Sequence, residues 1–172
     1  MEKNAFRTVV EICHEMMVPS GMGEELQRQR EMCIDPYTRV ANRSKELVPM
    51  EVKTVLTLEK SGKGLHVATT ICNQAKDHRV RVVMPTGLNT STHLADSAFE
   101  VVKRNNRHND TWTNPCGCER QQCFAAMEDE TNGLLVANRG LYEYEVLADE
   151  ENAIAVTLLR SVAEMGDWGY FP

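Results

Sequence analysis

NQAKDHRVRVVMPTG, residues 73–87, is the stretch that decides how the fold of this chain is interpreted. A strand places successive side chains on opposite faces, so Val80, Val82 and Met84 are expected to face a core. Arg79 and Arg81 then share the other face, where they are either solvated or paired with carboxylates or a ligand. The stretch therefore predicts a strand of an antiparallel sheet, with one apolar and one basic side.

Composition limits the classes of partner. The chain has 172 residues, and 19 Lys and Arg against 25 Asp and Glu give a net charge of −6. No basic run marks a nucleic-acid surface, and no apolar run reaches the length of a membrane span. Residues 1–16 show no uninterrupted apolar signal-peptide core. We expect a cytoplasmic protein without nucleic-acid or membrane partners.

Six cysteines raise the question of disulfides or metal. The ligand atoms of a zinc site lie near one another in sequence, in Cys116, Cys118, Cys123, His108 and Asp110. Structural zinc sites usually carry two pairs of ligands, and only half of that pattern is present. We therefore expect reduced thiols and no metal.

Short strand candidates recur along the chain, and several of them show an apolar period of two. Besides residues 78–84 they are residues 6–16, 48–58, 65–71, 99–103, 123–127, 134–137, 142–147 and 154–159. Ser61-Gly62-Lys63-Gly64 is a turn by composition and joins two of them in the clearest hairpin. Many short strands separated by turn signals predict an all-β, antiparallel sandwich or barrel with little helix.

The length predicts one domain over residues 1–172. Residues 20–46 are expected to leave the sheet as a loop or a helical excursion, because residues 24–32, EELQRQREM, favour a helix but have almost no apolar face. Residues 104–118 form a long polar loop around Trp112, whose ring either covers an edge of the core or offers a platform to a sugar or a partner.

Catalytic motifs are not evident in the sequence. A glycosidase needs two carboxylates beside the scissile bond, and spacing singles out no pair among Asp77, Asp96, Asp110, Glu119, Glu143 and Glu145. The sequence shows no Gly-rich phosphate cradle, Gly-x-Ser-x-Gly elbow or His-Glu-x-x-His motif. The residues alone predict no catalytic and no metal-ligating group.

Four blocks together resemble a known family: NQAKDHRVRVVMPTG, HLADSAFEVVKR (residues 93–104), GLLVANRGLYEYEV (133–146) and AVTLLRSV (155–162). They are similar, in this order, to the C-terminal β-domain of family 38 glycoside hydrolases, the bacterial α-mannosidase and mannosylglycerate-hydrolase branch. The resemblance implies a β-sandwich of the galactose-mutarotase-like super-sandwich type.

The resemblance also implies a function. Family members are retaining, metal-dependent hydrolases whose aspartates and zinc ligands lie in an N-terminal barrel, which this sequence does not contain. The chain is therefore expected to be inactive alone and to frame a carbohydrate site made by that barrel, with zinc or another divalent metal held there. Its expected partners are the remaining domains of a parent enzyme, with carbohydrate and a second copy of the chain as further candidates.

Two groups of residues are candidates for a site. In some relatives a loop of the β-region reaches the sugar, and Asn138, Arg139 and Tyr142 resemble it, although Asn-Arg-Gly is also an ordinary hairpin turn. Asp77, His78 and Arg79 are expected to form a structural salt bridge or turn clamp. Two alternatives to the framing role remain, a free-standing carbohydrate-binding module and a protein-interaction module.

Overall fold

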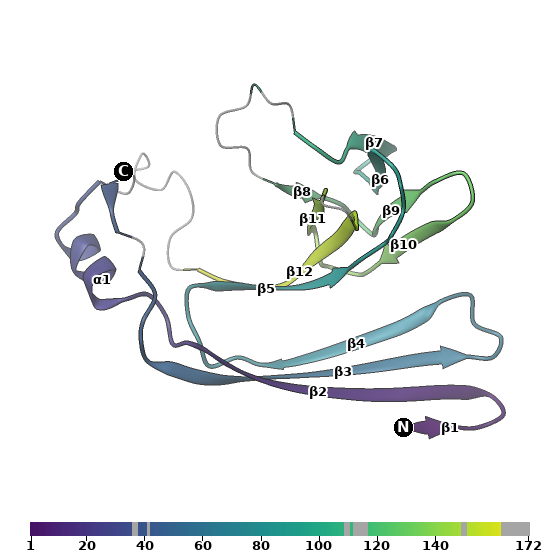
Figure 1. Cartoon of the computed structure of the whole chain (residues 1–172), viewed down its shortest axis with the longest axis horizontal. Coiled ribbons are helices and arrows are strands. Elements are labelled where there is room, and N and C mark those ends of the chain that lie inside the picture. Colours follow the sequence, from purple (N-terminus) through teal and green to yellow (C-terminus); the bar gives the residue numbers. More distant parts are fainter. Residues whose placement is uncertain (36–37, 41, 109–110, 112–116, 149–150, 163–172) are drawn as a thin grey trace. The chain divides into compact units, whose positions relative to one another are not determined.

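The computed structural model describes residues 1–35, 38–40, 42–108, 111, 117–148 and 151–162. In these residues there are twelve strands and one helix, arranged in three sheets (Figure 1). All strand pairs with an assigned register are antiparallel. The prediction of an all-β, antiparallel sandwich with little helix is therefore confirmed. The described helix is too short and too polar to cross a membrane.

Contacts divide the chain into two compact units. Unit 1 comprises Met1–His78 and, of the described residues after the second unit, residues 161–162, whereas unit 2 comprises Arg79–Arg160. The expectation of a single domain over residues 1–172 stays a prediction.

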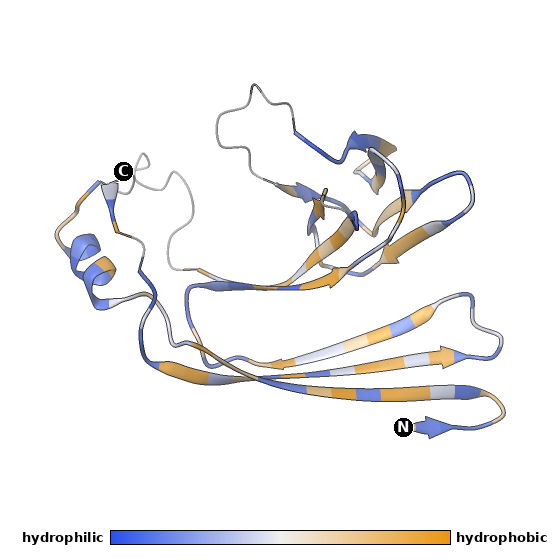
Figure 2. Ribbon diagram, viewed as in Figure 1, coloured by the Kyte–Doolittle hydropathy of each residue, from blue (hydrophilic) through white to orange (hydrophobic). Residues whose placement is uncertain are grey.

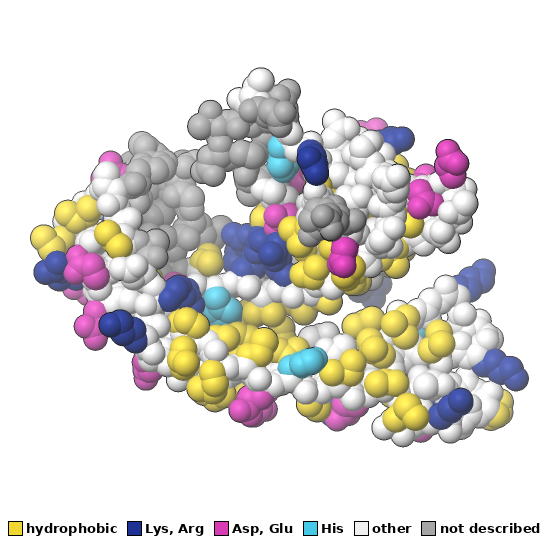
Figure 3. All heavy atoms as spheres, in the orientation of Figure 1, with side chains coloured by type: hydrophobic (Ala, Val, Ile, Leu, Met, Phe, Trp, Pro, Cys, Tyr) yellow, Lys and Arg dark blue, Asp and Glu magenta, His cyan; other side chains and the backbone are white. Residues whose placement is uncertain are grey.

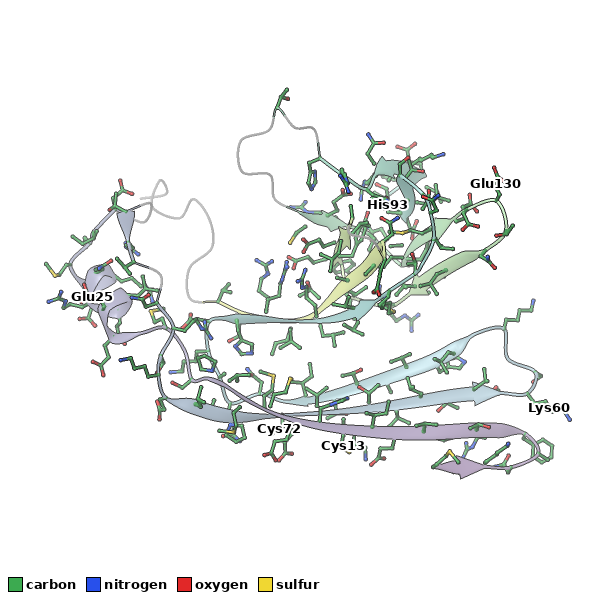
Figure 4. All side chains as sticks on the ribbon, in the orientation of Figure 1. Cys13, Glu25, Lys60, Cys72, His93 and Glu130 are labelled. Atoms are coloured by element: carbon green, nitrogen blue, oxygen red, sulfur yellow. The ribbon has the colours of Figure 1, made fainter. Side chains whose placement is uncertain are left out.

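Unit 1 is built on a long antiparallel sheet in the order β1-β2-β3-β4. Its strands are β1 (Glu2–Lys3), β2 (Arg7–Pro19), β3 (Leu47–Glu59) and β4 (Leu65–Cys72). The hairpin expected at residues 61–64 joins β3 to β4, and Figure 4 marks Lys60 where this turn begins. Apolar residues alternate with polar ones along β2 and β3, which gives the sheet two different faces (Figure 2).

The segment between β2 and β3 contains α1 (Glu24–Glu31), whose side chains are not buried. Glu24 and Glu25 occupy its first turn, and Arg28 and Arg30 lie near its end, so its charges suit the helix dipole. Helix propensity and charge order therefore explain this helix better than an apolar stripe does.

Unit 2 is a sandwich of two four-stranded sheets, in the orders β10-β9-β6-β7 and β5-β12-β11-β8. Both Thr86 and Gly87, just after β5, donate backbone hydrogen bonds to the Glu151 carbonyl before β12, as expected if β5 and β12 run antiparallel. The strands are β5 (His78–Met84), β6 (Thr92–Asp96), β7 (Val101–Asn105), β8 (Cys118–Arg120), β9 (Phe124–Glu128), β10 (Gly133–Ala137), β11 (Glu143–Leu147) and β12 (Ala153–Ser161).

The core of unit 2 lies between its sheets. Its buried apolar residues come from both sheets and from the loop after β5, and they are Leu88, Ala95, Ala125, Met127, Tyr144, Ile154 and Val156. Val82 and Met84 pack against this cluster, as the alternation in β5 predicted. Arg79 and Arg81 consequently point away from it.

Replacing Ile154 should test how much this core stabilises the chain. Ile154 is fully buried, and Ile154→Ala is expected to lower the free energy of unfolding by about 2–5 kcal/mol, through lost burial and a cavity. Leu135 on β10 is 57% exposed, so Leu135→Ala should cost roughly 0.5 kcal/mol. Urea unfolding measures both, and equal losses would contradict the placement of the core.

Candidate functional site

The outer face of the sheet β5-β12-β11-β8 carries a cluster of arginines and glutamates. Because strand side chains alternate, Tyr144 and Val146 of β11 face the core while Glu143 and Glu145 face outward. The β5 arginines reach this same outer face. We call Arg79, Arg81, Glu143, Glu145 and Arg160 the ion-pair cluster.

Each glutamate of the cluster binds more than one arginine. Arg79 places one guanidinium nitrogen 3.2 Å from Glu143 and the other 3.0 Å from Glu145. Arg81 also pairs with Glu145. At 24% and 28% exposure the two arginine side chains are partly withdrawn from water, so of the two readings for β5 the structure favours carboxylate pairing.

Glu143 has three side-chain partners, one of which is Arg79. Arg160 lies 2.8 Å from its carboxylate, and the Thr157 hydroxyl donates to it over 2.7 Å. Burial opposes ionisation of Glu143, but these hydrogen bonds and the arginine charge outweigh burial and hold its pKa below the ordinary 4.5. The cluster thus joins β5, β11 and β12 through arginines and glutamates that pair with one another.

A second polar network lies inside the sandwich, around the Tyr144 hydroxyl. His93 Nε2 lies 2.8 Å from this hydroxyl, Arg104 donates to it over 2.8 Å, and Glu119 Oε2 is 3.2 Å away. The rings of His93 and Tyr144 meet edge to face with centroids 5.6 Å apart. Burial raises the pKa of Tyr144 well above 10.0, so the hydroxyl stays protonated.

Asn106 fixes the orientation of His93, which Figure 4 labels. Its amide nitrogen donates to the Thr90 carbonyl over 2.8 Å, so its oxygen is free to accept from His93 Nδ1 at 3.0 Å. His93 Nε2 in turn lies 2.8 Å from the Tyr144 hydroxyl, so both ring nitrogens have partners within the fold. The role of this network is structural, because all its members are bonded within the fold.

The loop between β10 and β11 carries the predicted Asn138, Arg139 and Tyr142. The Asn138 side-chain oxygen accepts from the Leu141 N–H over 3.1 Å, and Gly140 has φ +84°, a conformation that favours glycine. Both Arg139 and Tyr142 are exposed, the latter by 59%, and neither side chain has a polar partner within the described residues. The loop thus presents a guanidinium and a phenol to solvent.

Gln121 holds the backbone of this loop through two hydrogen bonds. It is 2% exposed, its backbone N–H donates to the Tyr142 carbonyl over 2.9 Å, and its side-chain amide donates to the Leu141 carbonyl. Sequence reasoning missed this role, because Gln121 lies about 20 residues from the residues that it holds.

The second predicted group, Asp77, His78 and Arg79, does not form one cluster. Asp77 has φ +55°, its backbone carbonyl accepts from the Arg43 guanidinium, and the Lys76 carbonyl accepts from the same arginine over 3.3 Å. His78 Nδ1 lies 3.3 Å from the Lys76 carbonyl. Arg79 belongs to the ion-pair cluster, so the structure does not bring these three side chains to one site, and their clamp role stays a prediction.

A metal centre was not expected. Within the described part of the chain no group of three or more His, Cys, Asp or Glu could hold a metal ion. Asp110, Trp112 and Cys116, which entered the zinc and aromatic-platform alternatives, lie outside the described residues.

The geometry defines a β-sandwich domain with an ion-paired outer face and a polar loop, residues 138–142, that is directed to solvent. Residues 23–164 match the family model described as "Glycosyl hydrolases family 38 C-terminal domain", and the chain belongs to this family. The resemblance found in the four sequence blocks is thereby confirmed.

Relatives align with almost the whole chain. The chain is 42% identical over 171 residues to the "Putative mannosylglycerate hydrolase" of Halalkalibacterium halodurans, covering 99% of this chain and 19% of that protein. It is 43% identical to the crystal structure of an α-mannosidase from Enterococcus faecalis, covering 97% of this chain and 19% of that one, with a TM-score of 0.89. A family 38 glycosyl hydrolase structure from the same species is 42% identical, with a TM-score of 0.86 over 99% of this chain and 19% of that one.

Acid should weaken the fold through the ion-pair cluster. The pKa of Glu143 is lowered on folding, so its contribution is complete above about pH 4.5 and is lost as pH falls below 4.5 through the folded pKa. We expect Glu143→Gln to lower the free energy of unfolding at pH 7 by about 1–2 kcal/mol, and to flatten its decline in acid.

Glu130→Gln is the matched control. Glu130 is exposed at the tip of the β9–β10 hairpin (Figure 4), with no partner for its side chain among the described residues. Urea unfolding from pH 3 to pH 7 should give this variant the wild-type curve. Identical acid profiles for wild type and Glu143→Gln would show that the cluster adds no stability.

Proposed function

We propose that this chain is the C-terminal, non-catalytic β-domain of an α-mannosidase-like glycoside hydrolase. The observation that carries the proposal is the match of almost the entire chain, at 42–43% identity, to proteins of which it spans only 19%. Two of these relatives are described as a mannosylglycerate hydrolase and an α-mannosidase. The domain would frame a carbohydrate site formed mainly by another part of such a polypeptide.

The loop from Asn138 to Tyr142 is the proposed contact with sugar. Arg139 offers a planar fork of donors that suits sugar hydroxyls or an active-site carboxylate, and Tyr142 adds an exposed ring. Glu143, directly after Tyr142, is fixed by the ion-pair cluster, and Gln121 holds the backbone of Leu141 and Tyr142. The side chains of Arg139 and Tyr142 thus extend from a loop whose backbone is held in place, as a positioned binding group requires.

The divalent metal, zinc by resemblance, is assigned to the proposed catalytic domain. The described residues do not fit it, because they contain no cluster of three ligating side chains. When bound in that domain, the metal would supply Lewis-acid chemistry and orient the substrate. The described residues would therefore contribute binding and positioning.

A carbohydrate-binding module is the second candidate function, favoured by the exposed ring of Tyr142. Isothermal titration of the isolated chain with mannose and manno-oligosaccharides separates the two, since a module binds alone and a framing domain does not. The cytoplasmic location and a homo-oligomer stay predictions.

The isolated chain is expected to show no turnover. Aryl α-mannosides should release aryl alcohol at the rate of the buffer blank, with or without added zinc, because the described residues offer neither a paired acid and nucleophile nor a metal site. Hydrolysis well above the blank by purified chain would contradict the non-catalytic role.

Arg139 should matter to the parent enzyme more than to the fold. In the full-length polypeptide, Arg139→Ala is expected to lower kcat/KM by roughly 10- to 100-fold, since a positioned charged donor is lost. The melting temperature of the variant should equal that of the wild type, because Arg139 is exposed and has no partner among the described residues.

Lys103→Ala serves as the control for this substitution. It removes one positive charge from an exposed position of β7, away from the loop, and should leave kcat/KM at the wild-type value. Equal kinetics for the two variants would exclude Arg139 from the sugar site.

A further inference from the structure

The sheet β1-β2-β3-β4 has one face that is strongly aliphatic at its hairpin end. Strand register places Val10 beside Leu56 and Leu56 beside Val67, while Leu58 pairs with Leu65 one step further along. Directly paired residues share a face, so these side chains form one continuous surface. We call Val10, Ile12, Leu56, Leu58, Leu65 and Val67 the aliphatic face.

The opposite face of the same strands is more polar, although Val9 and Val55 also lie on it. Glu11 and Lys53 form an ion pair of 2.7 Å there, and His66 and Ala68 of β4 lie on that side. One apolar and one polar face is the pattern of a sheet with one solvated side and one covered side. The aliphatic face is thus the side that calls for a cover.

This face remains substantially exposed in the chain. Leu58, Leu65 and Val67 each expose 52–54% of their surface and Ile12 exposes 36%. Figure 3 shows hydrophobic side chains gathered along the strands of this sheet. Single exposed apolar residues are ordinary, but a contiguous group marks an interaction surface.

The edges of this sheet are open as well. On its outer side β2 pairs with β1 only at Thr8 and Val9, so within the described residues its edge from Val10 onward has no strand partner. The outer edge of β4 likewise ends the sheet. Long uncovered edges beside an apolar face are features that a folded protein normally covers.

We propose that the aliphatic face is the docking surface for another part of the parent polypeptide, one that presents aliphatic, uncharged side chains. This inference rests on the proposed function. The length of the relatives supports it, because about four-fifths of each relative lies outside the region matched by this chain. An intramolecular partner is held at high effective concentration, so a modest apolar area suffices to keep it docked.

The test compares two matched pairs of substitutions on β4. Leu65→Lys with Val67→Lys places two charges on the aliphatic face, and His66→Lys with Ala68→Lys places two on the polar face of the same strand. Each pair is made both in the isolated chain and in the full-length parent polypeptide. Thermal unfolding and size-exclusion chromatography are the readouts.

We expect the two pairs to behave alike in the isolated chain, because all four positions are exposed. In the full-length protein only the Leu65→Lys and Val67→Lys pair should lower the melting temperature, by several degrees, as two charges would be buried against an apolar partner.

Three results would overturn the inference. The two pairs could behave alike in the full-length protein. The Leu65→Lys and Val67→Lys pair could destabilise the isolated chain as much as the parent, which would mean that this chain covers the face itself. The isolated wild type could run as a dimer that only this pair dissociates, which would identify a second copy as the partner. A separate observation tests the proposed function itself. If the coding sequence of the parent encoded no further domain, the proposed function would fail, whatever the substitutions showed.

Discussion

A single buried hydroxyl, that of Tyr144, ties the two sheets of unit 2 together. Tyr144 stands on β11, whereas His93 and Arg104, both 2.8 Å from its oxygen, come from β6 and β7 of the facing sheet. A polar atom in an apolar core must be bonded, so the sheets can pack only in an arrangement that brings these groups to the hydroxyl. The network therefore adds orientation to a core that burial alone would leave less specific.

Strand β11 carries this constraint outward to the proposed site. Its inward side chains belong to the core and the Tyr144 network, while Glu143 and Glu145 anchor Arg79, Arg81 and Arg160 on the outer face. The loop with Arg139 and Tyr142 leads directly into β11, whose side chains are held on both faces of the strand. A rigid strand below a solvent-facing loop is an arrangement that can hold a binding group in place without contributing catalytic groups.

Unit 1 exposes an apolar surface that supports the proposed role of the chain as one domain of a larger polypeptide. Its long sheet has one polar and one aliphatic face, and open edges, within the described residues. The chain spans 19% of the length of the relatives that it matches. The exposed apolar surface and the family membership thus support the same proposal.

The sequence by itself determined the all-β class, the β3–β4 hairpin and the inward side of β5, because apolar alternation and turn chemistry are local properties. It missed β1 and β8, which have only two and three residues, and β6, whose buried side consists of His93 and Ala95 and so shows no apolar period. Only the tertiary structure paired Arg79 with Glu143 and Glu145, 64 and 66 residues away, and brought Tyr144 to His93. Such pairs depend on strand order and register, which the whole core decides and no single segment encodes.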